Sequence, residues 1–131
     1  MKNISAGYTT LAYISRNTEN IAMKAHHDWS YNEFSTFAML YAATIDSHID
    51  QEEEALIKQR LDEPRYQEVK SIFEQCSDHE CINTILSYHD QYMADEAGRQ
   101  RLLDDFKSVF TADHRYSPME QEMMHIFKQL L

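Results

Sequence analysis

A helix-start signature that recurs four times is the feature that most constrains the fold of this chain. It consists of Ser or Asp, two variable residues and Glu, and it begins at Ser30, Asp50, Ser77 and Ser117. In such a capping box the first side chain accepts a hydrogen bond from the backbone of the Glu, whose carboxylate accepts one from the backbone of the first residue. The chain has only two Gly and two Pro, too few turn residues for a many-stranded sheet. The sequence therefore predicts an all-α protein.

Apolar residues at helical spacing follow each signature and predict six helices with short connections. The expected ranges are 31–46, 51–61, 65–76, 78–93, 96–112 and 118–131. The fourth helix is expected to bury Ile82, Ile85, Leu86, His89 and Met93, and the last Met119, Met123, Ile126, Phe127 and Leu130. At 131 residues the chain has the length of one domain. We expect a single-domain bundle of six to seven helices over residues 30–131, preceded by a partly helical N-terminal segment, residues 1–29.

The net charge of −10, from 22 acidic and 12 basic side chains, argues against two classes of partner. An acidic surface repels phosphate backbones and anionic membranes, so we expect no nucleic-acid partner. No stretch approaches the ~20 apolar residues that span a bilayer, so direct membrane insertion is not expected. The first residues lack an apolar signal region, which favours a cytoplasmic protein. In that reducing compartment Cys76 and Cys81 are expected to be packed thiols.

A second pattern, eight residues long, occurs twice and combines Asp, a large hydrophobe, a capping residue and Glu. One copy runs from Asp46 to Glu53 and the other from Asp113 to Glu120. Each copy follows one helical pattern and overlaps the start of the next, so each predicts a tight acidic bend between two helices. Helical spacing places these four acids at or beside the buried stripes. Inward carboxylates need a hydrogen bond, a proton or a cation, because a bare buried charge is costly.

Two interpretations of the bends stay open at this point. In the structural one, Glu53 and Glu120 are capping residues, and the two Asp side chains bond loop amides as in Asx turns. In the functional one, the four acids bind a divalent cation together. The metal-ligating candidates are then Asp46, Glu53, Asp113 and Glu120, with Asp50 as an auxiliary ligand.

The type of cation follows from the ligands that take part. An all-oxygen site suits calcium or magnesium, whereas ligation by His48 and His114 inside the bends would suit zinc. The sequence favours the alternative, in which His48 and His114 are exposed loop histidines that bind no metal. An EF-hand is excluded, because Gln51 stands where that loop needs Gly and Ile57 stands where it needs the bidentate Glu.

No arrangement for catalysis is evident in the sequence. A di-iron bundle needs two Glu-x-x-His motifs, and only Glu122 with His125 fits. A nucleophile elbow and a phosphate-binding Gly loop are both missing. We therefore expect a non-enzymatic protein.

The twin bends resemble the motif of the TerB-like family of small helical tellurite-resistance proteins. The matching residues are Asp46, Ile49, Asp50 and Glu53, then Asp113, Tyr116, Ser117 and Glu120. The resemblance covers residues 30–131 and implies an all-α domain with two related halves whose acidic bends meet. It also implies a metal-binding or interaction module of stress and tellurite resistance, without established catalysis. The family's Gly after each Asp is replaced here by Ser47 and His114, which adopt a left-handed backbone less easily.

Two functions follow from these observations. The first is a non-enzymatic TerB-like module that binds a divalent cation (calcium, magnesium or zinc) at its paired bends. The alternative is a metal-free adaptor that holds a protein partner on an acidic or aromatic helix face. Eight Tyr and seven Met residues suit such a surface, which is also compatible with a homodimer.

Overall fold

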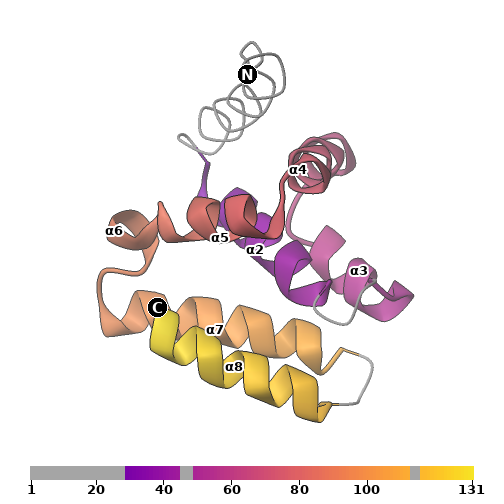
Figure 1. Cartoon of the computed structure of the whole chain (residues 1–131). Helices are drawn as coiled ribbons and strands as arrows, with labels where there is room; N and C mark the ends of the chain where they lie inside the picture. The colour runs from indigo at the N-terminus through magenta and orange to yellow at the C-terminus, as the bar shows by residue number, and fades with distance from the viewer. Residues whose placement is uncertain (1–28, 45–48, 113–115) are drawn as a thin grey trace, which may run out of the picture.

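The computed structural model describes residues 29–44, 49–112 and 116–131, which form a bundle of helices (Figure 1). The helices are α2 (Tyr31–Ala43), α3 (Gln51–Lys58), α4 (Glu63–Gln75), α5 (Asp78–Leu86), α6 (His89–Tyr92), α7 (Glu96–Phe110) and α8 (Pro118–Leu130). These ranges contain no strand, so the predicted all-α fold is confirmed. None of these helices is long and apolar enough to cross a membrane.

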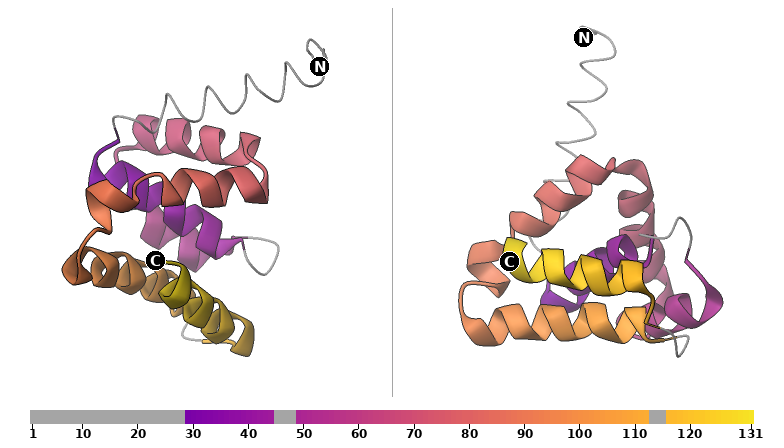
Figure 2. Two further views of the ribbon diagram at one scale, coloured as in Figure 1. Left: turned by 60° about the vertical axis from the view of Figure 1, so that its left-hand side comes forward. Right: turned by 60° about the horizontal axis from the view of Figure 1, so that its bottom comes forward.

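Helix α2 forms the centre of the fold and contacts α3, α4, α5 and α7. Nine of its 13 residues are buried, as its apolar sequence predicts. Helices α7 and α8 pack against each other and run antiparallel in the views of Figures 1 and 2. The central helix is thus enclosed by the others, and α8 lies at the outside of the bundle.

All four predicted capping boxes are confirmed. In each, the cap side chain accepts a hydrogen bond from the backbone of the Glu, and the Glu side chain accepts one from the backbone of the cap. The starts of α4 and α7 are capped by Asp62 and Asp95, each through one side-chain bond. Each such cap stabilises the start of its helix by ~1 kcal/mol. The capping residues in the sequence therefore indicate where these helices begin.

The single helix predicted over residues 78–93 is wrong, because the chain breaks between α5 and α6 at Ser87 and Tyr88. The amide of Tyr88 bonds the carbonyl three residues back, and this tighter turn rotates the residues that follow. The ring of Tyr88 thereby enters the core and stacks on Trp29 at a centroid distance of 6.2 Å. A continuous helix would bury His89, but its side chain is 45% exposed.

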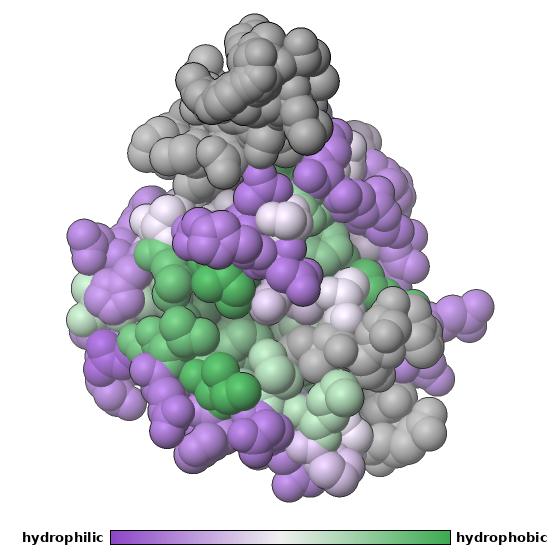
Figure 3. Space-filling view, in the orientation of Figure 1, coloured by the Kyte–Doolittle hydropathy of each residue, from purple (hydrophilic) through white to green (hydrophobic). Residues whose placement is uncertain are grey.

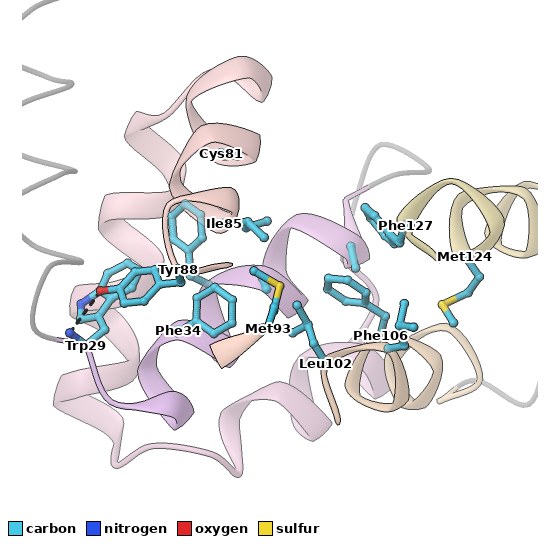
Figure 4. Packing of buried hydrophobic residues seen from close by; sticks show 14 of the residues in the cluster. Trp29, Phe34, Cys81, Ile85, Tyr88, Met93, Leu102, Phe106, Met124 and Phe127 are labelled. Atoms are coloured by element: carbon cyan, nitrogen blue, oxygen red, sulfur yellow. Dashed lines mark hydrogen bonds between the residues drawn. The ribbon is translucent and has the colours of Figure 1, made fainter. Parts of the chain in front are cut away.

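The main core combines aromatic and aliphatic side chains from helices far apart in the sequence (Figure 4). The ring of Tyr88 packs against both Trp29 and Phe34 at one end, and Phe106 packs on Phe127 at the other with a centroid distance of 4.4 Å. The backbone amide of Trp29 donates to the hydroxyl of Tyr88. Trp29, assigned by the sequence to the N-terminal segment, is therefore part of the packed core.

Asp105 joins α7 to α2 and to the turn after α3 through buried polar contacts. Its carboxylate accepts hydrogen bonds from the hydroxyls of Tyr31 and Ser35 at 2.6 and 2.8 Å. Nη2 of Arg60 donates to the same carboxylate at 2.6 Å. Burial, together with the bond to Asp105, raises the pKa of Tyr31, so the phenol stays protonated and continues to donate. Asp105 is 8% exposed and surrounded by donors, so it holds three parts of the fold together.

Candidate functional site

The first acidic bend ends in a reciprocal pair of hydrogen bonds at the start of α3. Asp50 accepts from the amide of Glu53 at 2.8 Å, and Glu53 accepts from the amide of Asp50 at 3.1 Å. Glu53 is 3% exposed, which confirms that it faces inward. The neighbouring Glu54 accepts from Lys70 at 2.9 Å and from the hydroxyl of Tyr66 at 2.8 Å. These two bonds lower the pKa of the Glu54 carboxyl.

The second acidic bend ends in the same way at the start of α8. Ser117 accepts from the amide of Glu120 at 3.1 Å, and Glu120 accepts from the amide of Ser117 at 2.9 Å. Glu120 is 7% exposed, so its predicted inward position is also confirmed. Each capping bond uses one oxygen of its glutamate. Both glutamates thus have the capping role that the structural interpretation gives them.

The other two acids of the predicted cation site, Asp46 and Asp113, lie outside the described residues. The proposed meeting of four carboxylates therefore stays a prediction. Within the described ranges, no three His, Cys, Asp or Glu side chains converge in a way that could hold a metal ion. The starts of α3 and α8 point toward the same side of the molecule in Figures 1 and 2.

The Glu-x-x-His pair of α8 lies on the surface. Glu122 and His125 are both exposed. A di-iron site needs its ligands to project into the interior of a helix bundle. This pair therefore lacks the orientation that such a site requires.

Helix α8 buries only part of the apolar stripe that its sequence predicts, since Phe127 is buried and Met123 and Ile126 are half-buried. Met119 and Leu130, both expected in the core, are 54% and 43% exposed. The buried side chains of this helix are Glu120, Met124 and Phe127. The face that α8 turns toward α7 is therefore rotated from the predicted one, so that Met124 is buried beside Phe127 while Met119 and Leu130 are exposed.

The apolar residues of α8 that stay exposed or half-buried form an outward stripe as a result. Met119, Met123, Ile126 and Leu130 follow one another at intervals of four, three and four residues, so they share one face of the helix. Met123 and Ile126 are half-buried. At a rise of 1.5 Å per residue the stripe is ~17 Å long. The sequence already indicates that some apolar residues of α8 stay outside the core, because this helix has more of them than one buried face needs.

The outward stripe is continued by residues of α2 and α5. The ring of Tyr41 lies 6.5 Å from the ring of Phe127, and burial together with the carboxylate of Asp78 raises the pKa of Tyr41. Tyr41 therefore lies between the start of α5 and α8. Figure 3 shows hydrophobic residues gathered over α5 and α8 on this face. We call this the α5–α8 surface and define it by Tyr41 and the incompletely buried apolar residues of the two helices, which are Ile82, Leu86, Met119, Met123, Ile126 and Leu130.

The surroundings of the α5–α8 surface are polar and acidic. The exposed charged residues of α5, α6 and α8 are mostly acidic, with Asp78, Asp90 and Glu122 against the single exposed lysine Lys128. Figure 3 shows hydrophilic residues along the edges of the apolar area. The whole chain carries a net charge of −10, so its surface potential favours cationic partners. An apolar area with an acidic border is suited to a ligand that is apolar on one side and basic on the other.

Comparisons with known proteins give no further guide to this surface. The sequence matches no family model, and neither a curated protein nor a solved structure shows significant similarity to it. The resemblance to the TerB-like family therefore stays a prediction.

Proposed function

We propose that this chain is a non-enzymatic interaction module whose α5–α8 surface holds a basic amphipathic helix of a partner protein. The observation that carries the proposal is the outward apolar stripe of α8, in which Met119 and Leu130 are 54% and 43% exposed. Scattered single hydrophobes are ordinary on a protein surface, but a contiguous apolar area marks an interaction site.

The shape of the area supports a helical ligand. Helices α5 and α8 flank Tyr41, and a docked helix with apolar residues at positions i, i+3, i+4 and i+7 would lie along the stripe. The stripe length of ~17 Å matches about three turns of such a helix.

The charge of the chain supports a basic ligand and disfavours a second copy as the occupant. Two copies would each bring a net charge of −10 to the interface, and exposed like charges repel. A helix with Lys or Arg on its polar face would instead contact the acidic border of the surface. Its association rate should fall as salt is added, because screening weakens this attraction.

The test uses a synthetic 14-residue helical peptide of leucine and lysine, with all leucines on one face, and a scrambled peptide of the same composition. We expect the amphipathic peptide to bind more tightly. Replacing Met119→Gln and Leu130→Gln together should weaken binding by roughly tenfold to thirtyfold, because each side chain would bury about half its apolar surface on docking. The double variant His125→Ala, Gln129→Ala, at exposed positions of the same helix, is the matched control. Equal binding of both peptides, or equal loss in both double variants, would refute the proposal.

A second proposal, cation binding at the twin bends, rests on a different observation. Glu53 and Glu120 occupy equivalent places in the two bends, and both carboxylates are buried. A cation held by these acids together with Asp46 and Asp113 would offset the cost of placing four negative charges together. The TerB-like resemblance implies the same kind of site.

Thermal unfolding in calcium, magnesium or zinc, compared with chelator, tests this second proposal. A cation at 100 times its dissociation constant adds ~2.7 kcal/mol to the free energy of unfolding. The substitutions Glu53→Gln and Glu120→Gln should remove the increase, since Gln preserves a capping box but removes the charge. Glu33→Gln and Glu80→Gln serve as controls, because their capping boxes lack the Asp that stands seven residues before the Glu in each bend. If none of the three cations raises the melting temperature over chelator, the bends are structural only.

A further inference from the structure

The methionines of the described ranges differ widely in their exposure to solvent. Met39 and Met93 are 0% exposed and Met124 is 6% exposed, so these three belong to the packed interior, where Figure 4 labels Met93 and Met124. Met123 is half-buried, and Met119 is 54% exposed. Within the described part of the chain, Met119 is therefore the methionine that a small reagent in solution reaches most readily.

Methionine has a reversible reaction that changes its polarity. A lone pair of the thioether sulfur attacks one oxygen of a peroxide, the O–O bond breaks, and the departing hydroxide takes up the proton of the transferred oxygen to form water. The sulfur is oxidised to a sulfoxide, and the peroxide is reduced. Methionine sulfoxide is polar and disrupts methionine-rich interfaces. Sulfoxide reductases restore the thioether, while a dithiol supplies the electrons and becomes a disulfide.

We propose that Met119 is a reversible oxidation site whose conversion to the sulfoxide by a peroxide releases the partner helix from the α5–α8 surface. This role of Met119 rests on the proposed function, because the partner helix is the ligand that oxidation releases. Met119 is the most exposed residue of the outward apolar stripe of α8. A helix docked on that stripe would have to bury the S=O group as well, and a polar group buried without a hydrogen bond is costly.

Oxidation of Met119 acts on docking and leaves the fold in place. Met119 lies in the first turn of α8, outside the core. Ser117 and Glu120 hold this turn through reciprocal capping bonds, in which the side chain of Met119 takes no part. Changes at exposed positions alter stability little. Oxygen on the sulfur of Met39 would instead disturb a buried contact, because this sulfur accepts a hydrogen bond from the hydroxyl of Ser35 at 3.4 Å.

Peroxide treatment of the folded chain tests the selectivity. The protein is incubated with hydrogen peroxide and then with dithiothreitol, and the oxidised residues are located by fragment-ion mass spectrometry. Dithiothreitol reverses disulfides and sulfenic acids at half-buried Cys76 and buried Cys81, but it leaves methionine sulfoxide in place. We expect Met119 to gain oxygen before Met123 and well before the three interior methionines. A saturating amount of the leucine–lysine peptide should slow this oxidation, because the docked helix covers the side chain.

Binding of the leucine–lysine peptide is then compared before and after oxidation. The oxidised wild type should bind about threefold to tenfold more weakly, because the apolar surface that one half-exposed methionine buries on docking is lost. Methionine sulfoxide reductases of both stereospecificities, supplied with dithiothreitol, should restore the affinity. Met119→Leu cannot form the sulfoxide, so peroxide should leave its affinity at the value of its own untreated sample. Met123→Leu, the matched control, should lose affinity on oxidation as the wild type does.

The results distinguish a failed switch from a failed docking surface. If the untreated protein binds the amphipathic and the scrambled peptide equally, the proposed function is wrong and the switch is wrong with it. If the untreated protein prefers the amphipathic peptide and oxidation of Met119 leaves its affinity unchanged, only the switch is wrong. The switch is also refuted if Met119→Leu loses as much affinity in peroxide as the wild type, or if oxidation lowers the melting temperature. Binding would then be lost through other residues or through unfolding.

Discussion

Replacing Asp105→Asn should destabilise the protein far more than the same change at Asp104 next to it. Asp105 accepts hydrogen bonds from Tyr31, Ser35 and Arg60, whereas Asp104 is exposed and accepts one from Gln100. In the Asn variant an N–H group takes the place of one carboxylate oxygen. That group would face another donor instead of an acceptor, and the positive charge opposite it would lose its partner.

The size of the effect can be worked out from the contacts. Hydrogen bonds that involve a charged group contribute about 1.5–3 kcal/mol, and removing one partner of a buried ion pair costs about 3–5 kcal/mol. The side chains of Arg60 and Asp105 are 26% and 12% exposed, so solvent screening reduces the cost of removing one partner of this ion pair. We expect Asp105→Asn to lower the free energy of unfolding by about 3 kcal/mol, and Asp104→Asn by less than about 0.5 kcal/mol.

Urea unfolding followed by helical circular dichroism measures this difference. With a slope of about 2 kcal/mol per M, a loss of 3 kcal/mol lowers the midpoint by about 1.5 M. The double variant Asp105→Leu, Arg60→Met should lose less than the sum of its two single variants, because it leaves no buried charge without a partner. If the two Asn variants have the same midpoint, or if the two substitutions of the pair are additive, the network does not hold the helices together.

Three further outcomes are expected from single substitutions. The folded protein lowers the pKa of Glu54 below its ordinary value of 4.5. The charged carboxylate therefore stabilises the fold above that pH, and this stabilisation is lost as the pH falls through the lowered pKa. Glu54→Gln should then make the melting temperature depend less on pH in the acid range. Replacing Ser117→Ala should cost ~1 kcal/mol in urea unfolding, because the cap of α8 is lost. Gly98→Ala should lower the melting temperature although Ala is the better helix former, since its Cβ would lie 2.2 Å from the carbonyl oxygen of Tyr92; a rise would contradict this geometry.

The helix starts and the inward position of two acids could be predicted from the sequence. Capping boxes are made between residues three apart, and the bonds at Ser30, Asp50, Ser77 and Ser117 are all present. Helical spacing also placed one glutamate of each bend on a buried face. These features depend on contacts within one turn of helix, so no knowledge of distant segments is needed to infer them.

Other features became visible only in the tertiary structure. The bond between Tyr31 and Asp105 joins residues 74 positions apart, and no local pattern distinguishes Asp105 from its neighbour Asp104. The break before α6 is likewise favoured by a distant contact, the stacking of Tyr88 on Trp29.

Helix α8 shows the division most clearly. Its sequence determines by itself that residues 118–130 form a capped helix, because the cap, the proline in the first turn and the apolar spacing are all local. The same sequence carries two adjacent apolar stripes, and either of them could pack on a neighbour. Contact with α7 decides that Met124 and Phe127 face inward, so Met119 and Leu130 are left on the surface that we propose for docking. Burial energy depends on the complementary shape of the neighbouring helix, and that shape exists only once the bundle has formed.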